Sequence, residues 1–204
     1  MSNFKLLKAP FNMENPITVQ VLGICSALAV TVQIKPAIVM ALSVTVVTAF
    51  SNLIISALRN TIPGRIRIIV QLVVIAALVI IVDQLLKAYV YDVSKKLSVF
   101  VGLIITNCIL MGRLEAFAMA NKPWPSFVDG IGNGLGYGLI LVIVAFVREL
   151  LGSGSFFGHK IIPQWLYDAG YVDNGLMILP PMALITIGTI IWLQRSKNRD
   201  LIEK

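Results

Sequence analysis

Two cysteines are the residues in this chain best suited to chemistry. Cys25 and Cys108 are its only cysteines, one in each half of the chain, and both lie in apolar stretches. Small or polar residues adjoin each thiol in the sequence, namely Gly23, Ser26, Thr106 and Asn107. A pair placed so alike in two halves suggests two ligands that face each other across an internal symmetry axis.

Two interpretations of the pair stay open at this point. Free cysteine is often no more than a small apolar residue that packs well in a core. The matched placement favours a metal site instead, because the small and polar neighbours permit close backbone approach and can hydrogen-bond to sulfur. Iron–sulfur and structural metal sites usually take four ligands, commonly thiolates. This chain has two, so a partner with its own matched pair is needed to complete such a site.

The elements that must position these cysteines are membrane helices. Of the 204 residues, 57% are hydrophobic and 13% are charged, and the mean hydropathy is +0.86, which lies far from an ordinary soluble domain. A bilayer core of about 30 Å requires roughly 20 apolar residues per helix. Six uncharged stretches approach that length: Ile17–Ile34, Ala37–Leu58, Ile68–Val82, Leu97–Met111, Gly130–Val147 and Leu176–Gln194.

The distribution of basic residues predicts the orientation of these spans. The net charge of +7 does not indicate a nucleic-acid partner, because in a membrane protein the placement of Lys and Arg matters more than their sum. Six spans put both termini on one side, with eleven of the 17 basic residues: Lys5, Lys8, Arg59, Arg65, Arg67, Arg113, Lys122, Arg195, Lys197, Arg199 and Lys204. The other six are Lys35, Lys87, Lys95, Lys96, Arg148 and Lys160. Both termini are therefore expected in the cytoplasm.

The order of elements in the first half recurs in the second. Each half has a cysteine-bearing helix and then a helix that ends in arginine, at Arg59 and at Arg148. Three helices are an odd number, so the second copy must run upside down, as in inverted-repeat membrane proteins. The predicted fold is one all-α integral membrane domain over residues 1–204, with six transmembrane helices in two inverted three-helix repeats. The repeats cover about 16–90 and about 96–195, and the first helix of each is expected to be broken or short.

A glycine tract opens the fifth predicted span. Its sequence is Asp129-Gly-Ile-Gly-Asn-Gly-Leu-Gly-Tyr-Gly138. It lacks the spacing of a dinucleotide-binding loop, and no strand precedes it. Gly130, Gly134 and Gly138 instead share one helix face and Gly132 and Gly136 another, a pattern typical of close helix packing.

Ionisable residues near the spans are interpreted mainly as structural. Ionisable groups within the membrane are functional suspects by default. Asp83 lies four residues before Lys87, which suits a helical ion pair. Arg148 with Glu149, and Arg113 with Glu115, are expected to mark helix ends. The only histidine, His159, lies in a loop and is a weak candidate ligand. A tight turn is expected at Lys35-Pro36.

Several segments taken together are specific to one family. They are Asn15-Pro-Ile17, Leu22-Gly-Ile-Cys-Ser-Ala-Leu-Ala-Val-Thr31, Ile104-Ile-Thr-Asn-Cys-Ile-Leu-Met-Gly-Arg113, Glu115-Ala-Phe-Ala118 and the glycine tract 129–138. Along nearly its whole length the chain resembles the D-subunit family of the bacterial sodium-translocating NADH:quinone oxidoreductase. That family is shared with the E-type component of the Rnf electron-transport complex. Ser26-Ala27 and the glycine tract resemble the sodium-pump branch.

The resemblance implies a redox role within a larger complex. Cys25 and Cys108 would supply two thiolates to a [2Fe-2S] cluster shared with a pseudo-symmetric partner, the E subunit, and Gly23, Ser26, Thr106 and Asn107 would surround them. The A, B, C and F subunits would complete the complex and bind NADH, flavins and quinone. The chain would lie in the bacterial inner membrane as a non-catalytic subunit of an enzyme that exports sodium as electrons pass. The alternatives are an Rnf-type subunit, a non-redox secondary transporter and an assembly scaffold.

Overall fold

The computed structural model describes residues 6–7, 10, 15–89, 102–156, 159–160 and 175–197, and these are mostly helical. The helices are α2 (Ile24–Val30), α3 (Ile34–Leu58), α4 (Arg67–Tyr89), α6 (Cys108–Arg113), the π-helical turn η1 (Leu114–Ala118), α7 (Pro123–Ser153), the 3-10 turn η2 (Gly175–Ile178) and α9 (Pro180–Lys197). Two short strands, β1 (Ser155–Phe156) and β2 (His159–Lys160), pair antiparallel after α7. Residues 97–101 of the predicted fourth span lie outside the described residues.

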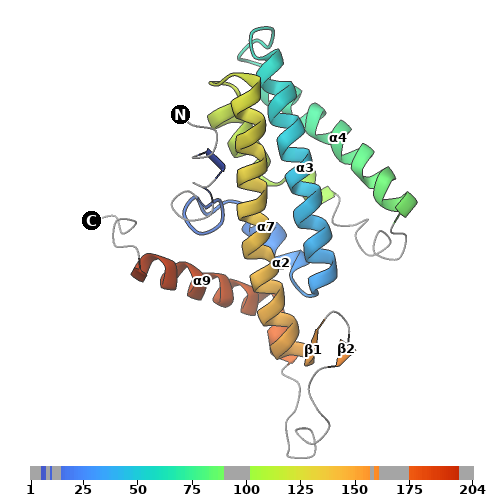
Figure 1. The fold of residues 1–204 in the computed structure, drawn as a ribbon, viewed down its shortest axis with the longest axis vertical. Coiled ribbons are helices and arrows are strands. Elements are labelled where there is room, and N and C mark those ends of the chain that lie inside the picture. Colours follow the sequence, from blue (N-terminus) through green and yellow to red (C-terminus); the bar gives the residue numbers. More distant parts are fainter. Residues whose placement is uncertain are drawn as a thin grey trace, which may run out of the picture.

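Three helices of the described part are long and apolar enough to cross a membrane, namely α3, α4 and α7. α3 and α7 lie side by side along the long axis of the molecule and form its most extensive helix pair (Figure 1). α4 packs on α3, and α9 extends sideways from the lower end of α7. The structure therefore confirms an all-α membrane architecture, while six spans in two repeats stay a prediction.

The glycine tract brings α3 and α7 into backbone contact. Gly130 lies against Ala49, Gly134 against Thr45 and Gly138 against Ala41. The residue numbers therefore rise along α7 while those of the partners fall along α3. A methyl group at Gly134 would lie 2.6 Å from Thr45 Cα, and one at Gly130 would lie 2.7 Å from Ala49 Cα. Only a hydrogen atom fits in these places. The predicted packing role of this glycine face is confirmed, and the two helices run antiparallel.

The second glycine face of α7 packs against the start of the chain. A methyl group at Gly132 would lie 3.2 Å from Leu6 O, and one at Gly136 would lie 2.8 Å from Pro10 O. The Asn15 side-chain amide also donates to Gly136 O at 3.2 Å. Glycine on two faces thus lets α7 pack against α3 and the N-terminal segment at once.

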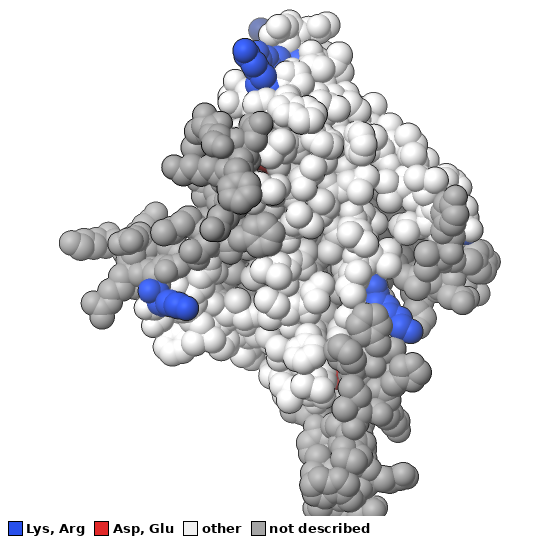
Figure 2. All heavy atoms as spheres, viewed as in Figure 1, with Lys and Arg blue, Asp and Glu red and all other residues white. Residues whose placement is uncertain are grey.

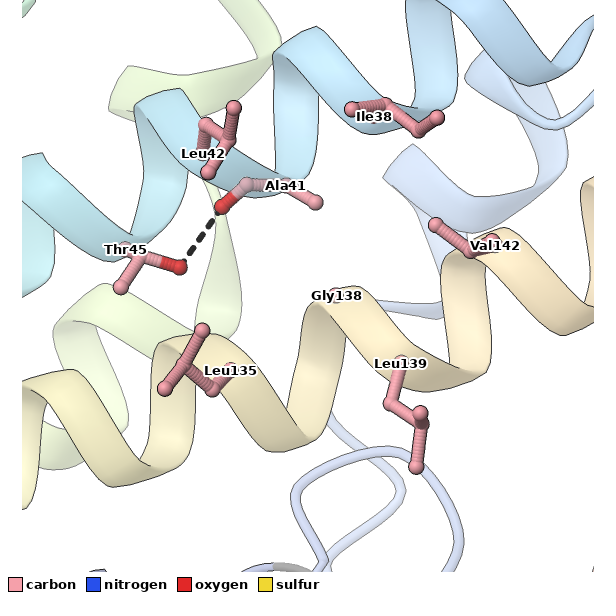
Figure 3. A pocket seen from close by; sticks show the side chains of 8 residues that line it. All are labelled: Ile38, Ala41, Leu42, Thr45, Leu135, Gly138, Leu139 and Val142. Atoms are coloured by element: carbon pink, nitrogen blue, oxygen red, sulfur yellow. Dashed lines mark hydrogen bonds between the residues drawn. The ribbon is translucent and has the colours of Figure 1, made fainter.

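An apolar groove opens where α3 and α7 cross. It has a volume of about 330 Å³ and is lined by Ile38, Ala41, Leu42, Thr45, Leu135, Gly138, Leu139 and Val142 (Figure 3). The Thr45 hydroxyl does not make this lining polar, because it donates to Ala41 O within its own helix at 2.7 Å. The groove therefore matches a hydrocarbon environment.

The first predicted span is not one continuous helix. Asn15 caps a short turn over residues 16–19, since its side-chain oxygen accepts from the backbone N–H of Ile17 at 3.0 Å. The backbone then unwinds before α2, with positive φ at Val21 (57°) and Gly23 (79°). The second cysteine helix is also interrupted, because residues 102–105 are helical and the helix restarts at Cys108. The prediction of two broken first helices agrees with both interruptions.

Two predicted boundaries are wrong. Lys35 and Pro36 do not form the turn, since α3 begins at Ile34 and both lie in its first helical turn, where proline is tolerated. The bend lies at Thr31–Gln33 instead. Arg148 and Glu149 do not end the fifth helix, which continues to Ser153.

Charged side chains gather at the ends of the long helices. Figure 2 shows a central face without charged side chains, with basic side chains at the end where α3 leads into α4 and at the left and right sides of the view. The predicted helical ion pair is confirmed, with Lys87 Nζ 2.6 Å from Asp83 Oδ2 near the opposite end of α4. This distribution fits an apolar slab bounded by two polar surfaces.

The close contact of α3 and α7 yields a stability prediction. Gly134→Ala should lower the free energy of unfolding by about 1–3 kcal/mol, because the new methyl group overpacks against the Thr45 backbone. Gly188→Ala on α9 is the matched control, since no atom lies within 4 Å of a methyl group there. It should leave stability unchanged or raise it by up to about 1 kcal/mol through helix propensity. Equal effects of both changes on unfolding in detergent would contradict the packing role.

Candidate functional site

Cys25 and Cys108 line one pocket. Cys25 is the second residue of α2 and Cys108 the first residue of α6, and both thiols are free and exposed. The pocket has a volume of about 140 Å³. Its other lining residues are Gly23, Ser26, Leu103, Thr106 and Asn107. The fold thus brings together the two thiols, which are 83 positions apart in the chain, at an open surface.

Local sequence explains why each short helix begins at or next to a cysteine. Gly23 adopts the left-handed backbone conformation that ends the unwound segment before α2. At the second site, Asn107 is the N-cap of α6, and its side-chain oxygen accepts from Ile109 N at 3.3 Å. The Gly23 conformation changes the direction of the chain before α2, and the Asn107 side chain provides an acceptor for a free N–H group at the start of α6.

A buried hydrogen-bond network joins the two cysteine segments. The Ser26 and Tyr137 hydroxyl oxygens lie 2.5 Å apart, and Asn107 Nδ2 donates to Ser26 Oγ at 3.3 Å and to Tyr137 OH at 3.5 Å. Ser26 Oγ also donates to Gly23 O at 2.9 Å. Ser26 follows one cysteine and Asn107 precedes the other, so Tyr137 on α7 connects both.

The predicted neighbours of the thiols behave differently from one another. Gly23, Ser26 and Asn107 belong to the network, whereas Thr106 lines the pocket with an exposed side chain whose hydroxyl reaches only Gly102 O, at 3.5 Å. The side chains of Ser26 and Asn107 bond each other, Tyr137 and backbone groups in the described part of the chain. These two polar neighbours therefore link the two segments to each other.

Tyr137 is a site residue that was not predicted from the sequence. In the sequence it was interpreted only as part of the glycine tract. In the structure its side chain is 0% exposed and its hydroxyl reaches both cysteine segments. One sequence signal was present: a tyrosine inside an apolar span requires a buried partner for its hydroxyl.

Among the described residues, those that line the pocket offer two thiols as ligands. Among the described residues, no cluster of three or more His, Cys, Asp or Glu side chains could hold a metal ion. The side chain of His159, the weak candidate, lies outside the described atoms, and its backbone belongs to β2. Any four-ligand centre at this pocket must therefore draw further ligands from elsewhere.

Arg148 and Glu149 stabilise the bend between α2 and α3. Arg148 is 1% exposed and donates to Leu28 O at 3.3 Å and Thr31 Oγ1 at 2.5 Å, at the carboxyl end of α2. It also donates to carbonyl oxygens of Met177, Ile178 and Leu179. Glu149 Oε2 accepts from Ile34 N, the first amide of α3, at 2.6 Å. A cation at a helix carboxyl end and an anion at a helix amino end both complement the helix dipole.

A second pair of buried charges follows the Cys108 helix. Arg113 ends α6, as predicted, but it is buried and pairs with Asp129 on α7 through both Nε and Nη2. Its guanidinium also lies 5.4 Å from the centre of the Phe117 ring. Glu115, in η1, pairs with Arg67 on α4 at 2.5 Å. These charges connect the second cysteine segment to α7 and α4. Because α6 continues directly into η1 as far as Ala118, Glu115 does not mark a helix end and both residues make structural contacts.

Comparison with known proteins identifies relatives over nearly the full chain. Residues 3–191 match the family described as Rnf-Nqr subunit, membrane protein. The chain is 62% identical to the D subunit of the Na(+)-translocating NADH-quinone reductase of Aeromonas hydrophila over 199 residues, which covers 98% of this chain and 95% of the relative. It is 61% identical over 201 residues to the D subunit of the Haemophilus ducreyi reductase, covering 98% and 97%. The identity to the D subunit from Photobacterium profundum is 61% over 191 residues, covering 94% and 91%.

The contacts of Arg148 predict a large effect of its removal. Arg148→Met should reduce the free energy of unfolding by about 3 kcal/mol or more, because several buried carbonyl oxygens lose a charged donor. Arg195→Met on the exposed end of α9 is the control and should change stability by less than about 0.5 kcal/mol. Unfolding midpoints in detergent measure both. An unchanged midpoint for Arg148→Met would show that these bonds do not stabilise the bend.

Proposed function

The chain belongs to the Rnf-Nqr family of membrane subunits, and we propose that it is the D subunit of a bacterial Na(+)-translocating NADH-quinone reductase. Full-length relatives at 61–62% identity have that name, and three described helices suit a membrane. The observation that carries the proposal is the meeting of Cys25 and Cys108 in one pocket. The chain is then a non-catalytic subunit of an oxidoreductase complex, in the inner membrane of a bacterium.

Cys25 and Cys108 are proposed to hold half of a [2Fe-2S] cluster. The donor set fits, since two thiols from different segments line one small pocket and both are accessible from outside the chain. The chain has only two cysteines, so two further ligands come from a partner, which we propose to be the pseudo-symmetric E subunit. A cluster held by these thiols would supply one-electron transfer chemistry inside a hydrocarbon layer about 30 Å thick.

The polar residues at the pocket have a separate task in this proposal. They keep two unwound backbone segments hydrogen-bonded at membrane depth, where unsatisfied groups are costly. Gly23 permits the close approach of Tyr137 and Asn107, because a methyl group there would lie 2.9 Å from the Tyr137 ring and 3.2 Å from Asn107 Oδ1. NADH, flavins and quinone are assigned to the A, B, C and F subunits.

We further propose six spans in two inverted repeats. If Arg59 is aligned with Arg148, Ala41 is the counterpart of Gly130, and Ala49 is the counterpart of Gly138. The Gly130–Ala49 and Gly138–Ala41 contacts then exchange under a twofold rotation, and Thr45 meets its own counterpart Gly134. A twofold axis across the membrane plane requires this antiparallel contact.

Polar contacts at the two ends of the α3–α7 pair support the same symmetry. At one end, Arg148 and Glu149 of α7 bind the connection that follows α2. At the other end, Asn52 Nδ2 donates to Ser126 O at 3.1 Å and Ser56 Oγ donates to Asn121 O at 2.6 Å. Each long helix thus stabilises the connection behind the cysteine helix of the other half.

Iron content tests the cluster. In the complex with all its subunits, Cys25→Ala or Cys108→Ala should remove about two irons per complex, the corresponding electron paramagnetic resonance signal and quinone reduction. Thr48→Val is the matched control, because it removes a buried hydroxyl that bonds only Val44 O of its own helix. Cys25→Ser provides a variant of nearly native size if the alanine variants do not assemble. Retained iron in the assembled variants refutes the cluster and favours a transporter or scaffold role.

Topology is tested by a reporter fused after Lys204. The basic residues concentrate on the side of the termini, which is therefore expected to face the cytoplasm. A reporter that works only in the cytoplasm should be active when it is fused after Lys204. A reporter at Lys35, in the first turn of α3, should show the opposite location. Activity of the Lys204 fusion only outside the cytoplasm reverses the proposed orientation.

A further inference from the structure

We propose that Tyr137 is a positioning residue that fixes Cys25 and Cys108 relative to each other through Ser26 and Asn107. Its hydroxyl connects the two cysteine segments to the central helix α7, so that both thiols keep the spacing that one shared cluster requires. The inference rests on the proposed function for the cluster. The spacing of the thiols can also be measured without iron.

One arrangement of protons satisfies all the hydrogen bonds around Tyr137 at once. Ser26 Oγ donates its only proton to Gly23 O, so the 2.5 Å contact with Tyr137 uses the tyrosine proton. Asn107 Oδ1 accepts from Ile109 N, which turns its amide nitrogen toward Ser26 and Tyr137. In this arrangement each contact of the network has a donor and an acceptor, so the three side chains hold one another in place.

Tyr137 is also held from behind. Its neighbours in sequence, Gly136 and Gly138, place α7 directly against Pro10 and Ala41. The side chain is 0% exposed, and its ring lies against Gly23, where a methyl group would come within 2.9 Å of Cε2. The hydroxyl is therefore held by the closely packed α3–α7 pair.

The cysteine segments need such a fixed point. α2 and α6 contain only seven and six residues, and helices of that length have little stability of their own in isolation. An unwound segment precedes each one. The bonds to Ser26 and Asn107 connect these two short helices directly to each other and to α7. Residues that orient ligands behind a metal commonly change metal affinity by about 10–100-fold when mutated.

The test replaces the hydroxyl alone. In the assembled complex, Tyr137→Phe should release iron to a chelator at least about tenfold faster than the wild type. The electron paramagnetic resonance lines of the cluster should broaden, because the thiols sample more geometries. The unfolding midpoint of the complex should change little, since the ring keeps its packing. Ser26→Ala should have the same effect, and the double variant should match either single variant, since both remove one link.

Two controls separate this inference from its premise. Thr48→Val should leave iron release and line shape at wild-type values. In chelator-treated complex, oxidative cross-linking of Cys25 to Cys108 should be several-fold slower in Tyr137→Phe than in the wild type. Absence of iron from the wild-type complex refutes the cluster, but the cross-linking rate still tests the positioning role. The proposal is overturned if Tyr137→Phe keeps the wild-type rate of iron release, the wild-type line shape and the wild-type rate of cross-linking. If Tyr137→Phe does not assemble, the same three measurements on Ser26→Ala test the proposal.

Discussion

α3 and α7 approach each other so closely that backbone meets backbone along one face of α7. Glycine at three positions of that face makes this possible, because even a methyl group would overlap Thr45 or Ala49. In a membrane, where lipid is as apolar as leucine, such close packing is a main source of helix association. The cysteine segments, the N-terminal segment and the bend between α2 and α3 all contact this pair, so their positions depend on it.

Interrupted helices create a second constraint, which buried polar side chains meet. Unwound backbone at membrane depth is tolerated only where other groups satisfy it. Arg148 and Glu149 do so behind α2, and Asn107 caps α6. These groups are buried and hydrogen-bonded. The two charged side chains thus have structural partners within the fold, and their burial does not require a bound ion. Their positions at helix ends also place positive charge near carbonyls and negative charge near amides.

The isolated chain exposes what a functional assembly would cover. Both cysteines are accessible at the pocket that they share, and few residues of the apolar helix α4 are buried. An accessible pair of thiols is a suitable half-site for a centre that takes four ligands. In the proposed assembly, this pocket is the half of the shared site that the chain contributes.

The sequence alone determined the membrane class, the close-packing glycine face, the cysteine pair and the Asp83–Lys87 ion pair. These features follow from hydropathy, small-residue spacing and i,i+4 spacing, which are local properties of the sequence. Tertiary structure decided what depends on distant contacts. Residues 148–149 look like a helix end in sequence, yet they lie inside α7 because the ends of α2 and α3 supply partners for both charges. Tyr137 became part of the site only when folding brought Ser26 and Asn107, which are 81 residues apart, to its hydroxyl.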